Sequence, residues 1–478
     1  MKKRLSLLLT AALLPMLAAC GQSGLPTAST PTIAAQPTSA EARATTPARP
    51  RRTATSEQAR GETPTTGPVE TPTPGEGEDE TPAVEPVESP VSPEDEGNVV
   101  TDPLGLELQA TVVAGLPVTP TPGGESPGFG GFEGVHVMQI DTAEGFGPYW
   151  AAYSYGMRRF EPLEQHFVAV YSREGDGWRE VDRIELEDPD YLDRMGVQQV
   201  PIEPENVWLQ VESAVGAHSG CFNILRFDGQ RLHNEVSHCG SAPGAGSLED
   251  LNGDDVLDVL LDATDHYVIC YACNVDYITT EVMRWDGSNM VNVRFQQVAD
   301  SEPEELRELT DRAIELAEHD LWKDAQAMIE ETRKFGSQDP AYIWNAALIN
   351  LDATKRAEHI EYSGYPLLST IFYGDYPAVL STLGRFNIDA IFNPNSDLFT
   401  GSPVAGNLEF MVEYVARTTT LQLEAQPDLA AAYFVRGWAL ALLDPRDPSA
   451  LADIQQAADL DPSEALFAEA LDYLEEQQ

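Results

Sequence analysis

The chain has 478 residues, enough for two or three domains, and 78 acidic against 29 basic side chains give it a formal net charge of −49. This charge excludes a nucleic-acid-binding protein, because binding to phosphates needs a basic surface. The same charge favours solubility and attracts cations to the surface. Nucleic acid is therefore not among the expected partners.

The N-terminus is typical of an exported protein. Basic residues 2–4 precede the apolar run Leu5–Leu14, and a Leu-Ala-Ala sequence stands directly before Cys20. The apolar run is too short to span a bilayer as a helix, so it predicts a cleaved signal and not a membrane anchor. A secreted, soluble protein in which Cys20 is incidental is the alternative.

The small residues before Cys20 resemble the lipobox of bacterial lipoproteins. This resemblance implies that residues 1–19 are a signal peptide and that Cys20 becomes the lipid-modified N-terminus. Two or more acyl chains give stable anchoring, whereas one chain gives only marginal binding. The expected location is extracytoplasmic, with the protein held at the bacterial cell membrane by its lipid.

Residues 20–128 are rich in Thr, Pro, Ser and Glu, and no aromatic residue occurs before Phe129. Such a composition cannot bury enough apolar surface to offset the entropy of ordering the chain. We therefore predict a disordered stalk. Its one apolar segment, Leu104–Val113, is predicted to add an edge strand to the domain that follows.

Residues 129–298 alternate between apolar and polar side chains, as β-strands do. Three segments, beginning at His166, Phe222 and Thr280, each join a strand, a Gly-containing turn and a second strand, which predicts a hairpin. Their spacing of roughly 57 residues is close to that of a propeller blade, but a complete propeller needs at least four blades. We predict an all-β domain that is either a partial, propeller-like sheet or a sandwich.

One acidic loop in this region is suited to a metal ion. Asp250, Asn252, Asp254 and Asp258 place oxygen-bearing side chains at positions 1, 3, 5 and 9, and Val256 offers its carbonyl at position 7. Ca²⁺ prefers six to eight oxygen ligands. Position 12 is not Glu, so the loop is not an EF-hand. An acidic turn capped by its own Asp side chains is the alternative.

The loop resembles the Asp-x-Asn-Gly-Asp-Gly-x-x-Asp sequence of calcium-binding propeller repeats of the integrin-α and VCBS type. This resemblance implies that Ca²⁺ is the cofactor and that a buried strand follows, which Val259–Leu261 fits. The sequence departs from the pattern at Asp255, where the family has Gly. Asp tolerates left-handed backbone better than most residues, so the loop can still close.

Four cysteines remain after Cys20, namely Cys221, Cys239, Cys270 and Cys273. An even number in an exported protein favours two disulfides, and the sequence leaves their pairing open. Cys221 and Cys239 flank one predicted hairpin and would lie close together if its strands pair. A zinc site that includes His218 and His238, or four free thiols, are the alternatives.

Helical spacing of apolar residues begins after Ser301 and defines an all-α domain over 302–478. Helices are predicted over 303–334, 340–357, 366–385, 407–424, 428–443, 448–460 and 463–476. The segment from Ala431 to Pro462 resembles a tetratricopeptide repeat, except for one extra residue in its turn. The resemblance implies close helix packing at Gly437, Ala450 and Ala457, and a helix stop at Pro462.

The sequence contains no hydrolase elbow, no His-Glu-x-x-His and no phosphate-binding Gly-Lys-Ser/Thr loop. We therefore expect a non-catalytic binding or scaffold protein whose helical domain engages a protein or peptide. An envelope glycan-binding module, or a divergent hydrolase with its site near Trp208 or Trp285, is the alternative. The loop 386–407, with its three Phe residues, is either a recognition loop or a plug in the helical core.

Overall fold

The computed structural model describes residues 102–116, 132–142, 147–157 and 165–478, which belong to one compact unit. The predicted signal peptide, the predicted lipidation site Cys20 and most of the predicted stalk lie outside the described residues. None of the described helices is long and apolar enough to cross a membrane.

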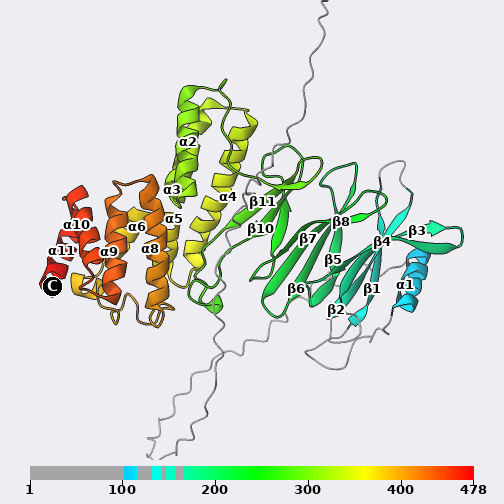
Figure 1. The fold of residues 1–478 in the computed structure, drawn as a ribbon, viewed down its shortest axis with the longest axis horizontal. Coiled ribbons are helices and arrows are strands. Elements are labelled where there is room, and N and C mark those ends of the chain that lie inside the picture. The colour runs from blue at the N-terminus through cyan, green and yellow to red at the C-terminus, as the bar shows by residue number, and fades with distance from the viewer. Residues whose placement is uncertain (1–101, 117–131, 143–146, 158–164) are drawn as a thin grey trace, which may run out of the picture. The chain divides into compact units, whose positions relative to one another are not determined.

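An eight-stranded antiparallel sheet forms the first part of the structure and curls as a half-barrel (Figure 1). Its strands are β1 (Phe132–Ile140), β2 (Tyr149–Met157), β3 (His166–Glu174), β4 (Gly177–Leu186), β5 (Tyr191–Val200), β6 (Val207–Val215), β7 (Ser219–Phe227) and β8 (Leu232–Cys239). The strand order is β4-β3-β2-β5-β6-β7-β8, and β1 pairs with β2. Strand β2 thus pairs with β1, β3 and β5.

This first sheet is apolar on both faces. Successive residues of a strand point to opposite sides, and both sets are apolar in its central strands. In β3, Val168 and Val170 join one buried cluster, whereas Phe167 and Ala169 join another. The first of these clusters is built from strands β1 to β8 alone. The opposite face is covered by a helix at one end and by a second sheet at the other.

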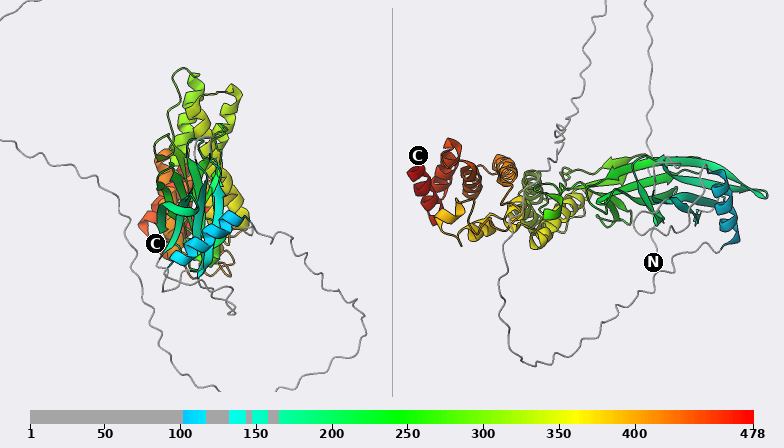
Figure 2. Two further views of the ribbon diagram at one scale, coloured as in Figure 1. Left: turned by 90° about the vertical axis from the view of Figure 1, so that its right-hand side faces the viewer. Right: turned by 90° about the horizontal axis from the view of Figure 1, so that it is seen from below.

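The covering helix is α1 (Pro103–Gly115), which lies across the first sheet in Figure 2. The side chain of Asp102 caps its N-terminus, and a proline occupies the first helical position. Leu108 and Val112, one helical turn apart, are both buried against the sheet. The edge strand predicted over Leu104–Val113 is therefore wrong, because its apolar side chains cover a sheet face instead of extending a sheet edge.

A second, four-stranded sheet has the order β12-β11-β10-β9. Its strands are β9 (Gly246–Glu249), β10 (Asp258–Asp262), β11 (Thr280–Trp285) and β12 (Met290–Asn292). Val259 and Leu261 of β10 pack with Trp208 and other side chains of the first sheet. Leu260 points to the other side and packs with Trp344 of a helix. The second sheet therefore has apolar contacts on both faces.

All three predicted hairpins are present, as β3–β4, β7–β8 and β11–β12. In the second and third, Asp228 and Asp286 each accept two backbone N–H groups at 2.8 Å, and the Gly that follows has a positive φ. The propeller-like expectation is wrong for these strands. Two of the hairpins share one continuous sheet, because β2, β5 and β6 connect them, whereas separate blades would each form their own sheet.

Helices follow the strands in the order α2 to α11 (Figure 1). Their bounds are α2 (Glu304–Glu318), α3 (Trp322–Thr332), α4 (Pro340–Tyr362), α5 (Pro366–Tyr373), α6 (Tyr376–Leu383), α7 (Ile388–Ile391), α8 (Leu408–Ala425), α9 (Ala430–Leu443), α10 (Pro448–Leu460) and α11 (Ala465–Gln477). The predicted helix 366–385 is divided in two. Gly374 has φ 82°, which ends α5, and Asp375 caps α6.

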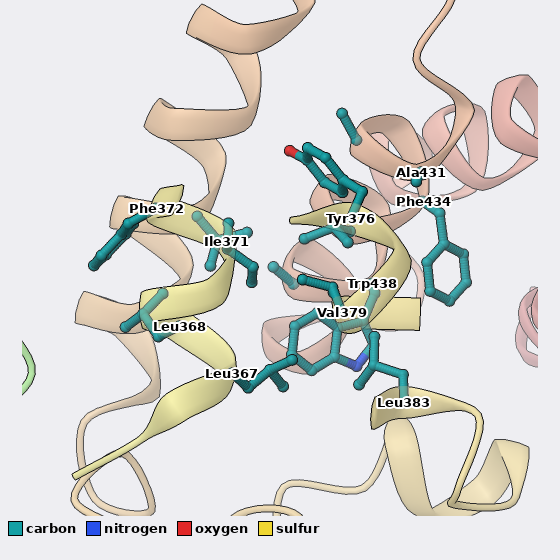
Figure 3. Packing of buried hydrophobic residues seen from close by; sticks show 14 of the residues in the cluster. Leu367, Leu368, Ile371, Phe372, Tyr376, Val379, Leu383, Ala431, Phe434 and Trp438 are labelled. Atoms are coloured by element: carbon teal, nitrogen blue, oxygen red, sulfur yellow. The ribbon is translucent and has the colours of Figure 1, made fainter. Parts of the chain in front are cut away.

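The helices share one large apolar core, part of which is shown in Figure 3. Gly437 of α9 lies against α10, where a Cβ atom would stand 2.8 Å from the carbonyl oxygen of Ala450. Ala450 and Ala457 are fully buried. Pro462 lies in the turn that follows α10. The close helix packing expected at these residues is therefore present, although the repeat family itself stays an expectation.

The aromatic residues of the loop 386–407 fill the helical core. Phe399 is fully buried and stacks on Trp438, and Phe392 stacks on Tyr473 with ring centroids 4.9 Å apart. Of the two interpretations offered by the sequence, the structure agrees with the plug, because rings buried in this way are not free to recognise a partner.

Candidate functional site

The acidic loop connects β9 to β10 and is organised around Asp250. One oxygen of its carboxylate accepts the N–H groups of Gly253 and Asp254 at 2.8 and 3.1 Å, and the other accepts that of Asp255 at 2.9 Å. Asp255 adopts φ 64°, the left-handed conformation that Gly would take in the calcium-binding pattern. The loop therefore adopts the closed backbone conformation of the calcium-binding pattern, although Asp255 replaces the usual Gly.

Asp258, at the end of this loop, is a fully buried carboxylate. Its Oδ2 accepts the N–H of Leu251 at 3.1 Å, and its Oδ1 has no hydrogen-bond partner among the described residues. The pKa of Asp258 is raised to about 6, mainly by burial and to a smaller extent by the charges of Asp254 and Asp250. A buried oxygen without a donor, near two other carboxylates, is a favourable position for a cation.

Other contacts of the loop compete with a bound metal. The guanidinium of Arg284 pairs with Asp254, and the side-chain amide of Asn252 donates to the same carboxylate at 3.0 Å. Among the residues that the structure describes, no three His, Cys, Asp or Glu side chains are grouped tightly enough to hold a metal ion. Ca²⁺ binding would therefore require Asp254 to exchange Arg284 for the ion, with Asp250, Asp258 and the carbonyl of Val256 as further ligands.

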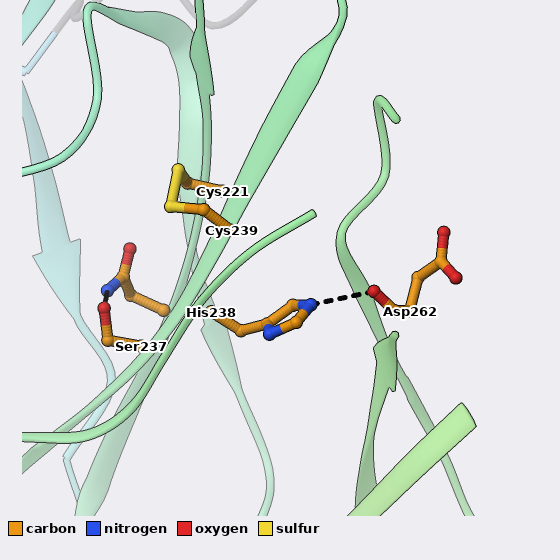
Figure 4. Close-up of a disulfide and its surroundings, with 6 residues drawn as sticks. Cys221, Ser237, His238, Cys239 and Asp262 are labelled. Atoms are coloured by element: carbon orange, nitrogen blue, oxygen red, sulfur yellow. Dashed lines mark hydrogen bonds between the residues drawn. A yellow bond between two sulfur atoms is a disulfide. The ribbon is translucent and has the colours of Figure 1, made fainter. Parts of the chain in front are cut away.

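The four cysteines form two disulfides, Cys221–Cys239 and Cys270–Cys273. The first joins paired residues of β7 and β8, as the hairpin predicted (Figure 4). The neighbouring His238 bonds the backbone oxygen of Asp262 at 2.8 Å and so links the two sheets. The zinc interpretation is wrong for these cysteines, because their sulfur atoms are consumed in disulfides.

A cluster of two histidines and two carboxylates lies where the second sheet meets α4, and the sequence did not predict it. His266 bonds Asp262 and Asp276, each at 3.3 Å, and His359 of α4 lies 3.8 Å from Asp276. The bonds to Asp262 and Asp276 raise the pKa of His266 to about 9. The four-residue spacing of Asp262 and His266 is a local signal, whereas His359 comes from a distant part of the chain.

The connection between β10 and β11 anchors the second sheet to the helices. Val268, Ile269 and Val275 belong to the helical core. The backbone oxygen of Asn274 accepts the N–H of Gly364 at 2.9 Å. Strands and helices are therefore joined through buried contacts as well as through the chain itself.

The tryptophans proposed to mark a glycan site do not expose a free ring. Trp208 is 1% exposed, and Trp285 packs edge-on against it with ring centroids 5.0 Å apart. Arg226 lies over Trp285 at 5.0 Å from the ring centroid. Sugar stacking needs an open aromatic face, which the buried Trp208 does not offer, whereas Trp285 is only half-buried.

Comparison with protein-family models and with curated protein sequences finds no match to this chain.

Proposed function

We propose that this chain is a lipid-anchored, extracytoplasmic binding or scaffold protein. In this proposal Cys20 carries the lipid, Ca²⁺ stabilises the loop between β9 and β10, and the helices present a surface to a protein or peptide. The two disulfides are compatible with an oxidising compartment outside the cytoplasm. The glycan-binding or hydrolase alternative depended on a carboxylate-lined pocket near Trp208 or Trp285, and the buried Trp208 gives it less support.

The buried carboxylate of Asp258 is the observation that carries the calcium part of the proposal. A buried carboxylate oxygen without a hydrogen-bond donor lowers the stability of the folded state unless a cation supplies the missing interaction, and Oδ1 of Asp258 is such an oxygen. The donor set, which combines carboxylates, an amide and a backbone carbonyl, consists of the hard oxygen ligands that Ca²⁺ prefers. In this role the ion is structural: it ties the loop to the first residue of β10.

Thermal unfolding of the full chain in Ca²⁺ and in excess EDTA tests this assignment, because a ligand that binds only the folded state raises the melting temperature. We expect a rise of several degrees in millimolar Ca²⁺. The paired variant Asp250→Ala/Asp258→Ala should lose both this shift and calorimetric Ca²⁺ binding. Asp176→Asn, in the exposed turn between β3 and β4, is the control and should keep both.

An unchanged melting temperature together with no heat of Ca²⁺ binding would show that the loop is an acidic turn without a calcium site.

The lipid anchor has its own test: Cys20→Ala should move the protein from the membrane fraction to the soluble fraction. If the distribution stays unchanged, the lipobox assignment is wrong.

A further inference from the structure

A groove of about 740 Å³ opens between three helical segments near the end of the chain. One wall is the start of α6, a second is the turn into α9, and the third is the turn between α10 and α11. Figure 3 shows two residues of its lining, Tyr376 and Ala431. The small side chains of Ala430 and Ala431 leave the space open at the first turn of α9. We call this feature the α9 groove.

The α9 groove has an apolar floor that is partly open to solvent. Tyr376 and Phe467 are buried below it, Leu380 and Leu429 are half-buried, and Leu460 is 37% exposed. Exposed apolar surface in a hollow is a common feature of interaction sites. A bulky apolar side chain of a partner would therefore remove Leu460 and its neighbours from water.

Every charged residue that lines the α9 groove is acidic: Asp428, Asp461 and Glu464. The surrounding segment has the same sign, since the chain contains no Lys or Arg after Arg446. Over that stretch it carries nine carboxylates, of which Asp453 is paired with Arg436, at Asp447, Asp453, Asp459, Asp461, Glu464, Glu469, Asp472, Glu475 and Glu476. The potential in the groove is therefore negative, which attracts cationic ligands and repels anionic ones.

We propose that the α9 groove binds a peptide segment in which Lys or Arg side chains surround one bulky apolar residue. The apolar residue would occupy the floor beside Leu380 and Leu460, while the cations pair with Asp428, Asp461 and Glu464. This inference rests on the proposed binding function and names the chemical class of its partner. The groove selects by charge as well as by shape, so an acidic peptide of the same apolar content is excluded.

Fluorescence anisotropy with a labelled heptapeptide that alternates lysine with leucine and phenylalanine tests this inference on the full chain. Two matched peptides separate the contributions: one replaces every lysine with glutamate, and the other replaces the apolar residues with serine. We expect binding of the first peptide only. The triple variant Asp428→Asn/Asp461→Asn/Glu464→Gln should weaken it at least tenfold, which corresponds to about 1.4 kcal/mol.

A second triple variant, Glu469→Gln/Asp472→Asn/Glu475→Gln, removes the same number of charges from α11 outside the groove, and we expect less than a twofold change. The amide replacements keep an acceptor oxygen at Asp461 and Glu464, which bond nearby backbone N–H groups. Equal losses in the two triple variants would show non-specific attraction and overturn the assignment, as would absence of binding. Neither result changes the calcium shift or the membrane fractionation, so the groove can fail while the proposed function stands.

Discussion

The sheets and the helices bury their apolar side chains in different ways. The first sheet divides its core, with one cluster on one face and two separate clusters on the other, under α1 and under the second sheet. The helices share one continuous core that extends from α2 to α11. The strands around this divided core carry additional links: a disulfide joins β7 to β8 within the first sheet, and His238 bonds across the two sheets. The continuous core relies instead on close packing.

The largest expected effect tests the covalent link in the divided core. Cys221→Ala/Cys239→Ala opens a link between residues 18 positions apart, and loop-closure entropy predicts a loss of about 3 kcal/mol in the free energy of unfolding. The control pair, Cys270→Ala/Cys273→Ala, opens a much shorter loop and should lose about 2 kcal/mol or less. Urea unfolding measures both. A larger loss in the control pair would place the main covalent support at the helical junction instead.

The next prediction tests close packing in the continuous core. Gly437→Ala should lower the free energy of unfolding by about 2 kcal/mol, because the new methyl group meets the backbone of Ala450 and the side chain of Ile454. Gly406→Ala is the control, since no atom lies within 4 Å of its added methyl group. Comparable free energies of unfolding for the two variants would show that α9 and α10 can move apart without loss of stability.

The third prediction concerns Asp258. Its pKa is raised from 3.8 to about 6, so without Ca²⁺ the folded state holds a proton that the unfolded state has released. Stability should therefore fall as pH rises from about 4 to 6. Asp258→Asn should remove this dependence and raise the calcium-free stability at pH 7 by roughly 1–3 kcal/mol. Denaturant titrations in EDTA at several pH values measure the free energy of unfolding of both proteins. A wild-type stability that rises between pH 4 and 6 would contradict a raised pKa of Asp258.

The smallest expected effect lies at the junction of the second sheet with α4. The pKa of His266 is raised from 6.5 to about 9, so its contribution is complete below pH 6.5 and is lost as pH rises through 9. The full shift would correspond to roughly 3 kcal/mol. Because the partner Asp262 is 30% exposed and solvent screens the pair, His266→Gln should flatten a decline of about 1 kcal/mol between pH 6.5 and 9. His233→Gln, at the start of β8, is the control. If stability declines equally in wild type and His266→Gln, other titratable groups cause the decline.

The elements that the sequence predicted well are those with local signals. The Asp-Gly turns at Asp228 and Asp286 determine two hairpins within a few residues, and apolar spacing places α8 to α11 close to their observed bounds. The predicted helices 303–334 and 366–385 are each two helices in the structure. The helix α1 also has a local signal, Asp102 followed by proline, which is typical of a helix start. Its apolar residues alone did not distinguish a helix from a strand.

The features that could not be predicted depend on contacts between distant residues. Nothing in the sequence near β2 indicates that it pairs with β5, or that His359 approaches Asp276. The loop ligands from Asp250 to Asp258 were recognisable because they are consecutive, whereas the contact of Arg284 with Asp254 comes from another strand. The α9 groove likewise requires three helices to be in place before its acidic lining is assembled.

The buried connection between β10 and β11 limits how this chain can be divided. A gene truncation at the composition boundary near residue 300 would leave Val268, Ile269 and Val275 without the helices that cover them. The helical fragment would in turn expose the apolar surface on which those residues rest. Neither product would be an independent module, so recombination or surface-display engineering of this protein should transfer the strands and helices together.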